Sequence, residues 1–205
     1  SAFELVCSAP PHATGRYAVE VSANTQDWTE SRVEFAYYSG PHVHAISPVL
    51  GPEDGGTLVE VSGDGFVASA QLVCRFGADS RPVAAEWVNG SVVRCRSPPH
   101  GVGNVSVQVS SNNQQYSAEV ALFEYQLPMV VASVRPAEGP VGGGTMVVVQ
   151  GLHFSHRSAA LGLLRCRFGD TSVPAFISHS MELRCVTPAS TSCSPVPLEL
   201  TSNAH

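Results

Sequence analysis

The chain has 205 residues, a formal net charge of −6 and only 14% charged residues, with 18 glycines and 15 prolines. Its eleven basic residues are all scattered arginines, so it lacks the concentrated positive charge of a nucleic-acid-binding protein. No apolar run approaches the roughly 18–20 residues of a membrane-spanning helix, and we expect no membrane insertion within this segment. The absence of lysine and the scarcity of isoleucine are typical of a GC-rich genome.

Residues 1–39 contain short runs that return later in the chain. Cys7 is followed by Ser-Ala-Pro-Pro-His, and Cys95 opens the similar run Cys-Arg-Ser-Pro-Pro-His. The run Phe-Ala-Tyr at Phe35 returns as Phe-Glu-Tyr at Phe123, so both matches share an offset of 88 residues. Residues 1–39 therefore resemble the C-terminal part of a repeat. Because the chain also starts without a leader-like segment, we expect it to be a fragment or a processed piece.

Residues 40–127 form one complete repeat, and residues 128–205 form another that lacks its last Phe-x-Tyr strand. Gly-Pro-x-x-Gly-Gly-Thr begins at Gly51 and again at Gly139, and alternating valines and Cys-Arg-Phe-Gly follow each time. The period of two, with turn residues about every 8–12 positions, predicts an antiparallel sandwich or barrel with little or no helix. The insertion Ala159–Leu164 is the one place where we expect a helical turn.

The repeat resembles the IPT/TIG domain, in that it carries, in order, GP-x-x-GGT, V-x-V-x-G-x-x-F, C-R-F-G, C-x-[ST]-P, V-x-V-x-[ST]-x-N and F-x-Y. The resemblance covers the whole chain in three registers. It implies an all-β fold of tandem immunoglobulin-like β-sandwiches. Several classes of protein contain such domains. They include plexins, the hepatocyte growth factor receptor family, fibrocystin-like surface proteins, Rel-type transcription factors and some starch-active enzymes. The fold alone does not select among these classes.

One cysteine pair recurs in each of the two longer repeats, as Cys74 with Cys95 and as Cys166 with Cys185. This recurrence favours one intradomain disulfide per module, and disulfides favour secretion or the cell surface. The alternative is a pair of buried free thiols. Zinc is disfavoured because the cysteines are not spaced as C-x₂₋₄-C and no histidine follows at ligand distance.

Two further cysteines stand outside these pairs. Cys7 aligns with the second member of a pair whose first member would lie upstream of the given sequence. Cys193 has no counterpart in the middle repeat, so it either pairs outside this segment or is a free thiol. The sequons that begin at Asn89 and Asn104 are candidate glycosylation sites, in agreement with the secretory pathway.

No motif in the sequence points to catalysis, and we expect no enzymatic activity and no cofactor. The glycine run Gly142–Thr145 is not followed by the Gly-Lys-Ser/Thr of a phosphate loop, and a strand follows it where such a loop needs a helix. We expect a tight turn with positive φ instead, there and at the equivalent Gly55-Gly56-Thr57.

Neither histidines nor tryptophans indicate a ligand site strongly. Two histidine pairs lack a third metal ligand, and we expect no metal. Trp28 and Trp87 are expected to pack against the sandwiches, with a role as sugar-binding platforms as the alternative. The histidine pairs are His42 with His44 and His153 with His156.

Six of the eleven arginines flank the paired cysteines, and strand alternation points them outward if the cysteines point inward. A cationic stripe for acidic glycans or an acidic partner, with all three arginines of the middle repeat on one face, is the functional hypothesis. Cross-strand pairing with Glu86, Glu182 and their neighbours is the ordinary arrangement for arginines on a sheet, and it is the one that we favour. The six are Arg75, Arg94, Arg96, Arg165, Arg167 and Arg184.

These patterns predict a non-catalytic extracellular segment of a larger receptor, adhesion protein or filamentous surface appendage. Its partners would be other protein chains or neighbouring modules of the same chain, and its role would be spacing and contact. An accessory module of a secreted carbohydrate-active enzyme is the alternative. A Rel-like intracellular module is disfavoured by the net negative charge and by the recurrent cysteine pairs.

Overall fold

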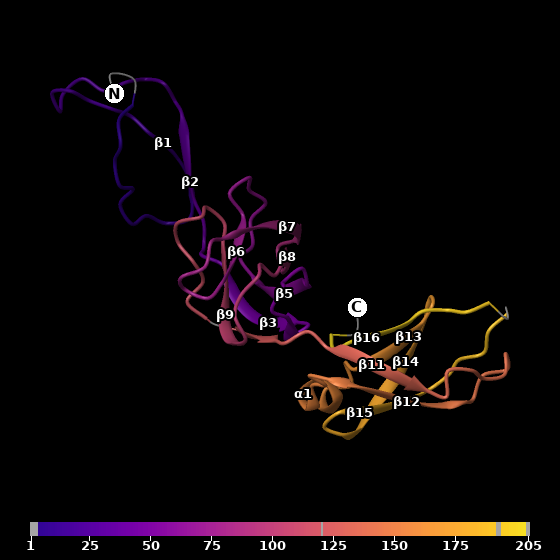
Figure 1. Ribbon diagram of the computed structural model, residues 1–205. Helices are drawn as coiled ribbons and strands as arrows, with labels where there is room; N and C mark the ends of the chain where they lie inside the picture. Colours follow the sequence, from indigo (N-terminus) through magenta and orange to yellow (C-terminus); the bar gives the residue numbers. More distant parts are fainter. Residues whose placement is uncertain (1–3, 120, 192–193, 204–205) are drawn as a thin grey trace.

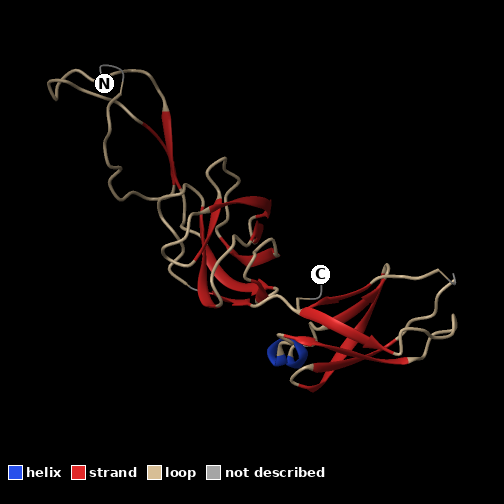
Figure 2. Ribbon diagram, in the orientation of Figure 1, coloured by secondary structure: helices blue, strands red, loops and turns tan. Residues whose placement is uncertain are grey.

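The computed structural model describes residues 4–119, 121–191 and 194–203. The chain passes end to end through three parts, as Figure 1 shows. We call them the N-terminal segment (residues 1–39), the middle module (40–127) and the third module (128–205). Strands make up nearly all of the regular structure (Figure 2), which confirms the predicted all-β class.

The N-terminal segment is an antiparallel pair of strands, β1 (Gly15–Ala18) and β2 (Glu34–Tyr37). Its apolar side chains lie on the surface: Val19 is 40% exposed, Val21 is 43% exposed and Phe35 is 45% exposed. The residues 88 positions later, in the middle module, are fully buried. These are Val107, Val109 and Phe123.

The middle module has eight strands in the order β3-β5-β8-β7-β6-β9-β10-β4, and β10 pairs with β4 in parallel. Strand β7 belongs to two layers, because Val83 and Ala84 pair with β6 whereas Ala85 and the residues after it pair with β8. The sheet therefore closes into a sandwich. The strands are β3 (His42–Ser47), β4 (Leu50–Pro52), β5 (Leu58–Asp64), β6 (Val73–Phe76), β7 (Val83–Asn89), β8 (Val92–Arg96), β9 (Gly103–Ser110) and β10 (Ala121–Gln126).

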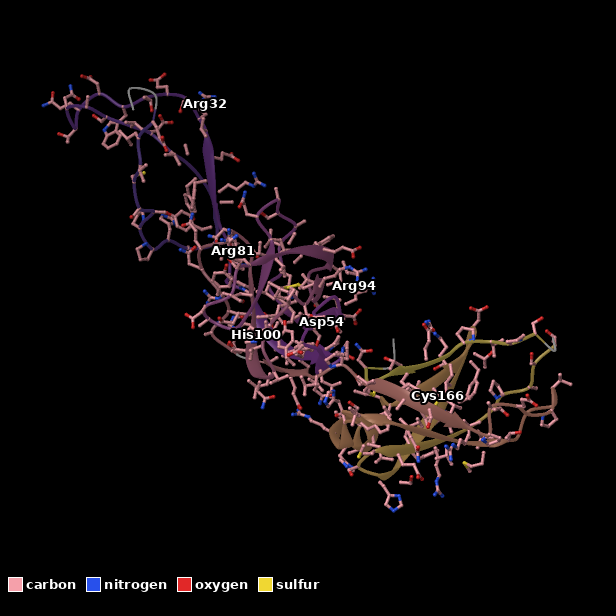
Figure 3. The ribbon with its side chains drawn as sticks, in the orientation of Figure 1. Arg32, Asp54, Arg81, Arg94, His100 and Cys166 are labelled. Atoms are coloured by element: carbon pink, nitrogen blue, oxygen red, sulfur yellow. A yellow bond between two sulfur atoms is a disulfide. The ribbon has the colours of Figure 1, made fainter. Side chains whose placement is uncertain are left out.

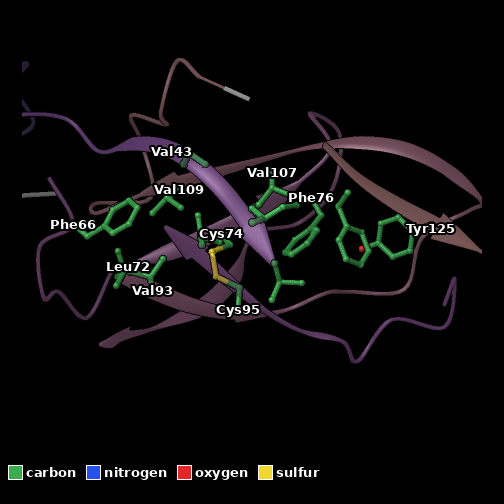
Figure 4. Packing of buried hydrophobic residues seen from close by; sticks show 14 residues of the cluster. Val43, Phe66, Leu72, Cys74, Phe76, Val93, Cys95, Val107, Val109 and Tyr125 are labelled. Carbon is green, nitrogen blue, oxygen red and sulfur yellow. A yellow bond between two sulfur atoms is a disulfide. The ribbon is translucent and has the colours of Figure 1, made fainter. Parts of the chain in front are cut away.

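The core of the middle module follows from the period of two along its strands. On β5, Val59 and Val61 are buried whereas Leu58 and Glu60 are exposed, as expected when alternate side chains point to opposite faces. Figure 4 shows how the apolar side chains from both layers gather around the sulfur bridge. Tyr125 is buried at the end of this cluster, and its hydroxyl donates to the carbonyl oxygen of Pro98 at 2.8 Å.

The third module repeats this design with fewer strands, in the order β11-β12-β15-β14-β13-β16. Strand β13 pairs with β16 as β6 pairs with β9, so Cys166 lies opposite Leu200 where Cys74 lies opposite Val109. Its elements are β11 (Val130–Arg135), β12 (Met146–Leu152), α1 (His156–Ala160), β13 (Arg165–Phe168), β14 (Thr171–His179), β15 (Glu182–Val186) and β16 (Leu198–Thr201).

The helix α1 lies three residues earlier than the predicted turn at Ala159–Leu164. Ser155 is the N-cap, and its hydroxyl accepts a hydrogen bond from the backbone N–H of Ser158 at 3.1 Å. Gly162 has φ of +69°, so the chain leaves the helix there. The cap and the glycine therefore set the position of the helix, and its start was predicted too late.

Candidate interaction surfaces

Each module contains one disulfide inside its sandwich. The structure joins Cys74 to Cys95 with a Cα–Cα distance of 6.3 Å, and Cys166 to Cys185 with a Cα–Cα distance of 6.4 Å. All four cysteines are at most 1% exposed. Cys7 is an exposed free cysteine, and Cys193 lies outside the described residues.

The expected single cationic face of the middle module is wrong. Cys74 and Cys95 meet in the interior from two different strands, β6 and β8, so their outward neighbours point away from each other. Arg75 contacts residues of the β9 side, whereas Arg94 contacts β5. A disulfide that joins two layers therefore places its flanking arginines on opposite faces.

Local partners hold the arginines of the middle module. The guanidinium of Arg75 donates to Gln108 at 2.8 Å and lies 3.9 Å from the centre of the Tyr116 ring. Arg94 donates to the carboxylate of Glu60 at 3.1 Å, and Arg96 donates to the carbonyl oxygen of Gly56 at 3.1 Å. Arg94 lies at the edge of the module in Figure 3.

The third module shows the same local pairing. Arg167 pairs with Glu199 across β13 and β16, and Arg184 pairs with Glu182 at 3.1 Å. Arg165 lies opposite Thr201 in the same register. Cross-strand and same-strand pairing with carboxylates thus accounts for Arg94, Arg167 and Arg184.

The sequons and the tryptophans are on the surface. Asn89 ends β7, where its side-chain oxygen accepts from the backbone N–H of Ser91 at 2.8 Å, and Asn104 is exposed on β9. Trp28 is 59% exposed and Trp87 is 43% exposed. Neither is buried in a core, and the expectation that both are packing residues is wrong. The indole N–H of Trp87 donates to the carbonyl oxygen of Phe66 at 3.2 Å, which fixes the ring on the surface.

The histidines make separate contacts. His44 lies 3.1 Å from Asp64, and Nδ1 of His153 lies 3.0 Å from the carbonyl oxygen of Pro128. Among the residues that the structure describes, no three histidine, cysteine, aspartate or glutamate side chains are placed to hold a metal ion. A search of the same residues finds no helix that is long and apolar enough to cross a membrane.

His42 has a raised pKa because Nδ1 of its ring lies 2.9 Å from a carboxylate oxygen of Glu119. This contact stabilises the fold fully below the usual pKa of 6.5, and the stabilisation is lost as the pH rises through the raised pKa. We expect Glu119→Gln to return the pKa of His42 toward 6.5 in a histidine NMR titration. Glu60→Gln is the control, and an unchanged His42 pKa in Glu119→Gln would contradict the prediction.

The junction between the middle and third modules was not predicted from the sequence. Arg157 on α1 lies 2.5 Å from a carboxylate oxygen of Glu124 on β10, and the amide of Asn203 donates to the hydroxyl of Thr57 at 3.3 Å. A hollow of about 420 Å³ also lies between the two modules, and its lining includes Glu124 and Asn104 of the middle module and Phe154 of the third module. The only signal for this junction was the insertion itself, which places an arginine next to the preceding module.

Comparison with known proteins agrees with the repeat pattern. A family model described as IPT/TIG domain matches residues 41–125 and 129–204. Plexin A3 of Danio rerio is 29% identical over 172 residues, which are 75% of this chain and 8% of that protein. Fibrocystin-L of Homo sapiens is 25% identical over 158 residues, which are 77% of this chain and 4% of that protein.

A solved structure shares the fold. The full extracellular region of plexin A4 superposes with a TM-score of 0.53 at 20% identity, and the match covers 90% of this chain and 16% of that one. The chain therefore spans a small fraction of the length of the proteins that it resembles.

Proposed function

Because this chain belongs to the IPT/TIG domain family, we propose that it is a non-catalytic structural segment of a larger extracellular or cell-surface protein. In this role it sets the spacing and orientation of neighbouring modules and offers surfaces for protein contacts. The division into residues 1–39, 40–127 and 128–205, and glycosylation at Asn89 and Asn104, are part of the proposal. The disulfides support an oxidising compartment.

The spacing role rests on one observation, which is the set of contacts between the middle and third modules. Each of these modules is a sandwich with its own disulfide. Only residues 127–129 separate β10 from β11, so the linker is too short to act as a flexible tether. The Arg157–Glu124 ion pair connects the modules from helix α1, and the Asn203–Thr57 hydrogen bond connects them from the segment after β16. Contacts from several elements restrict rotation about the linker.

Small-angle X-ray scattering tests this role. We expect the 205-residue chain to scatter as one elongated, stiff particle, and the double variant Arg157→Ala/Asn203→Ala to scatter as a mixture of bent forms. A half-exposed ion pair contributes up to about 1 kcal/mol, so the population of bent forms should rise up to about fivefold from that pair alone. Arg94→Ala removes an ion pair away from the junction and should leave the scattering unchanged. A wild-type chain that already scatters as a flexible mixture would contradict the proposal.

The contacts of the arginines within the chain reduce the number of arginines that are available to an acidic partner outside it. Arg94, Arg167 and Arg184 already face carboxylates, so their charge is offset locally. We therefore keep the prediction that arginines bind acidic glycans only for Arg75, Arg96 and Arg165. This set is spread over two modules and does not form one stripe.

A role as accessory module of a carbohydrate-active enzyme is the second candidate, and the exposed rings of Trp28 and Trp87 favour it. Exposed aromatic rings can stack on sugars. A polysaccharide that changes the fluorescence of both tryptophans, and loses binding in Trp28→Ala and Trp87→Ala, would favour this candidate over the spacer.

A further inference from the structure

The outer face of the third module carries an exposed apolar patch that crosses three strands. Phe176 on β14 is 67% exposed, Met146 on β12 is 53% exposed and Val186 on β15 is 42% exposed. Met146 lies directly opposite Val186 in the β12–β15 register. Large apolar side chains that gather on one sheet face mark an interaction site more often than isolated ones do.

Phe176 belongs to a four-residue row that runs across the sheet, and Met146 and Val186 lie in the next outward-facing row. Arg135 lies opposite Val148, Val148 lies opposite Arg184, and Arg184 lies opposite Phe176. The buried neighbours Val147, Val149 and Cys185 point inward, so the row points outward. We call the row together with Met146 and Val186 the apolar face.

The same face of the middle module has a different character. Its equivalent row is Ser47, Glu60, Arg94 and Glu86, in which two carboxylates flank one arginine. Arg96 lies opposite Leu58, where the third module has Val186 opposite Met146. The third module therefore has Val148 and Phe176 where the middle module has Glu60 and Glu86, and a polar surface has become an apolar one.

The sequons separate the two faces in the same way. Asn89, which ends β7, begins a sequon beside the face of the middle module, and the third module has His179 at the matching end of β14. Residues 128–205 contain no Asn-x-Ser/Thr sequence. The apolar face therefore has no acceptor for N-linked glycans within its own module.

The apolar face lies toward the end of the third module that is remote from the middle module, so the middle module leaves it accessible. Val130, which follows the inter-module linker, pairs with Leu152, whereas Arg135 and Met146 lie at the other ends of their strands. The junction contacts of Arg157 and Asn203 therefore do not cover it.

We propose that the apolar face binds the same face of a second copy of this chain, related by a twofold axis parallel to the strands. Such an axis reverses the order of the row. It places Arg135 over Phe176 of the partner subunit, and the reciprocal contact follows by symmetry. It also places Met146 against Val186 of the partner subunit.

The order of the cation and the aromatic ring along the row supports a second copy as the occupant. Arg135 forms no ion pair with any carboxylate in the described part of the chain, so its guanidinium is available to an aromatic ring. Arg184 is offset by Glu182 at 3.1 Å, so the centre of the contact is not repulsive. Each face thus supplies both the cation and the ring that the other face needs.

The size of the face sets the expected strength. Four strands about 4.8 Å apart, with rows about 7 Å apart, give a face of a few hundred Å². This is less than the roughly 800 Å² per partner of a standard specific interface, so we expect weak association of the isolated chain, with a dissociation constant on the order of 100 μM. The inference rests on the contact role of the proposed function and does not depend on the spacing role.

Sedimentation equilibrium of the 205-residue chain between about 10 μM and 1 mM tests the proposal. We expect the mean mass to rise above the 21.6 kDa of the monomer, and Phe176→Lys or Arg135→Glu to weaken association at least about tenfold. Leu58→Glu is the matched control, because Leu58 holds the position of Met146 on the middle module, and it should leave association unchanged.

A mixture of the two variants tests the geometry itself. Arg135→Glu and Phe176→Lys should each stay monomeric alone. Mixed, they recover one Arg135–Phe176 contact and gain one contact between opposite charges, so association should return. A wild-type chain that stays monomeric at 1 mM, an equal effect of Leu58→Glu, or a mixture that stays monomeric would overturn the proposal. Unchanged scattering stiffness in that case would leave the spacer role standing.

Discussion

Replacing Cys74 and Cys95 together by alanine is expected to lower the free energy of unfolding of the middle module by about 3 kcal/mol. The bridge closes a loop of sequence separation 21, and a loop of this length restricts the unfolded chain by about that amount in the chain-entropy model. Both sulfurs lie in the buried core, so the alanines also lose packing contacts. The total effect is large against a typical domain stability of about 5–15 kcal/mol.

Denaturant unfolding followed by the fluorescence of Trp87 measures this effect. Trp28 lies in the N-terminal segment and the third module contains no tryptophan, so a Trp28→Phe background makes the signal report the middle module alone. Cys7→Ala is the control, because Cys7 is exposed and free. An unchanged unfolding midpoint in Cys74→Ala/Cys95→Ala would show that the bridge does not stabilise the folded module.

The features that recur in the sequence are those that could be predicted from it. The recurring motifs align the strands of the middle module with those of the third module, and the constant offset between residues 1–39 and the middle module aligns Val107 and Val109 of β9 with Val19 and Val21, which follow the end of β1 at Ala18. Because side chains alternate between the two faces of a strand, the period of two then distinguishes inward-facing from outward-facing residues. The all-β class and the positive-φ turns at Gly55-Gly56 and Gly143-Gly144 follow from the same local patterns.

The layer to which each strand belongs could not be predicted in this way. Alternation says that Arg75 and Arg94 point outward, but it does not say that β6 and β8 face each other across the core. That arrangement depends on β7, which changes layers between Ala84 and Ala85. The junction was missed for a related reason, because the contact of Arg157 with Glu124 depends on how two modules are placed.

The second large effect concerns the two adjacent glycines of the Gly-Pro-x-x-Gly-Gly-Thr loop. Both have positive φ, +76° at Gly55 and +82° at Gly56, so a side chain at either position costs about 1–2 kcal/mol. At Gly55 an added Cβ would also lie 2.6 Å from the backbone oxygen of Ser97, whereas at Gly56 it meets nothing within 4 Å. The backbone of residues 97–99, which follow β8, cannot move aside as a side chain can.

We therefore expect Gly55→Ala to destabilise the middle module by about 3 kcal/mol or more and Gly56→Ala by about 1–2 kcal/mol, in the same Trp87 unfolding experiment. The third module offers a replicate, because an added Cβ at Gly143 would lie 2.6 Å from the backbone of Pro188 and one at Gly144 meets nothing within 4 Å. Equal effects at Gly55 and Gly56 would mean that close approach is not what requires the first glycine.

The same contact explains why two separate motifs recur together. The backbone N–H of Gly56 donates to the carbonyl oxygen of Ser97 at 2.8 Å, and the N–H of Thr57 donates to the hydroxyl of Ser97 at 3.1 Å. In the third module, Thr187 accepts the equivalent two bonds from Gly144 and Thr145. The hydroxyl residue of C-x-[ST]-P is thus the acceptor for the glycine loop. Ser97→Ala should therefore lower the stability of the middle module by about 1 kcal/mol, and Gly55→Ala should lose more because it forces the loop away from both acceptors.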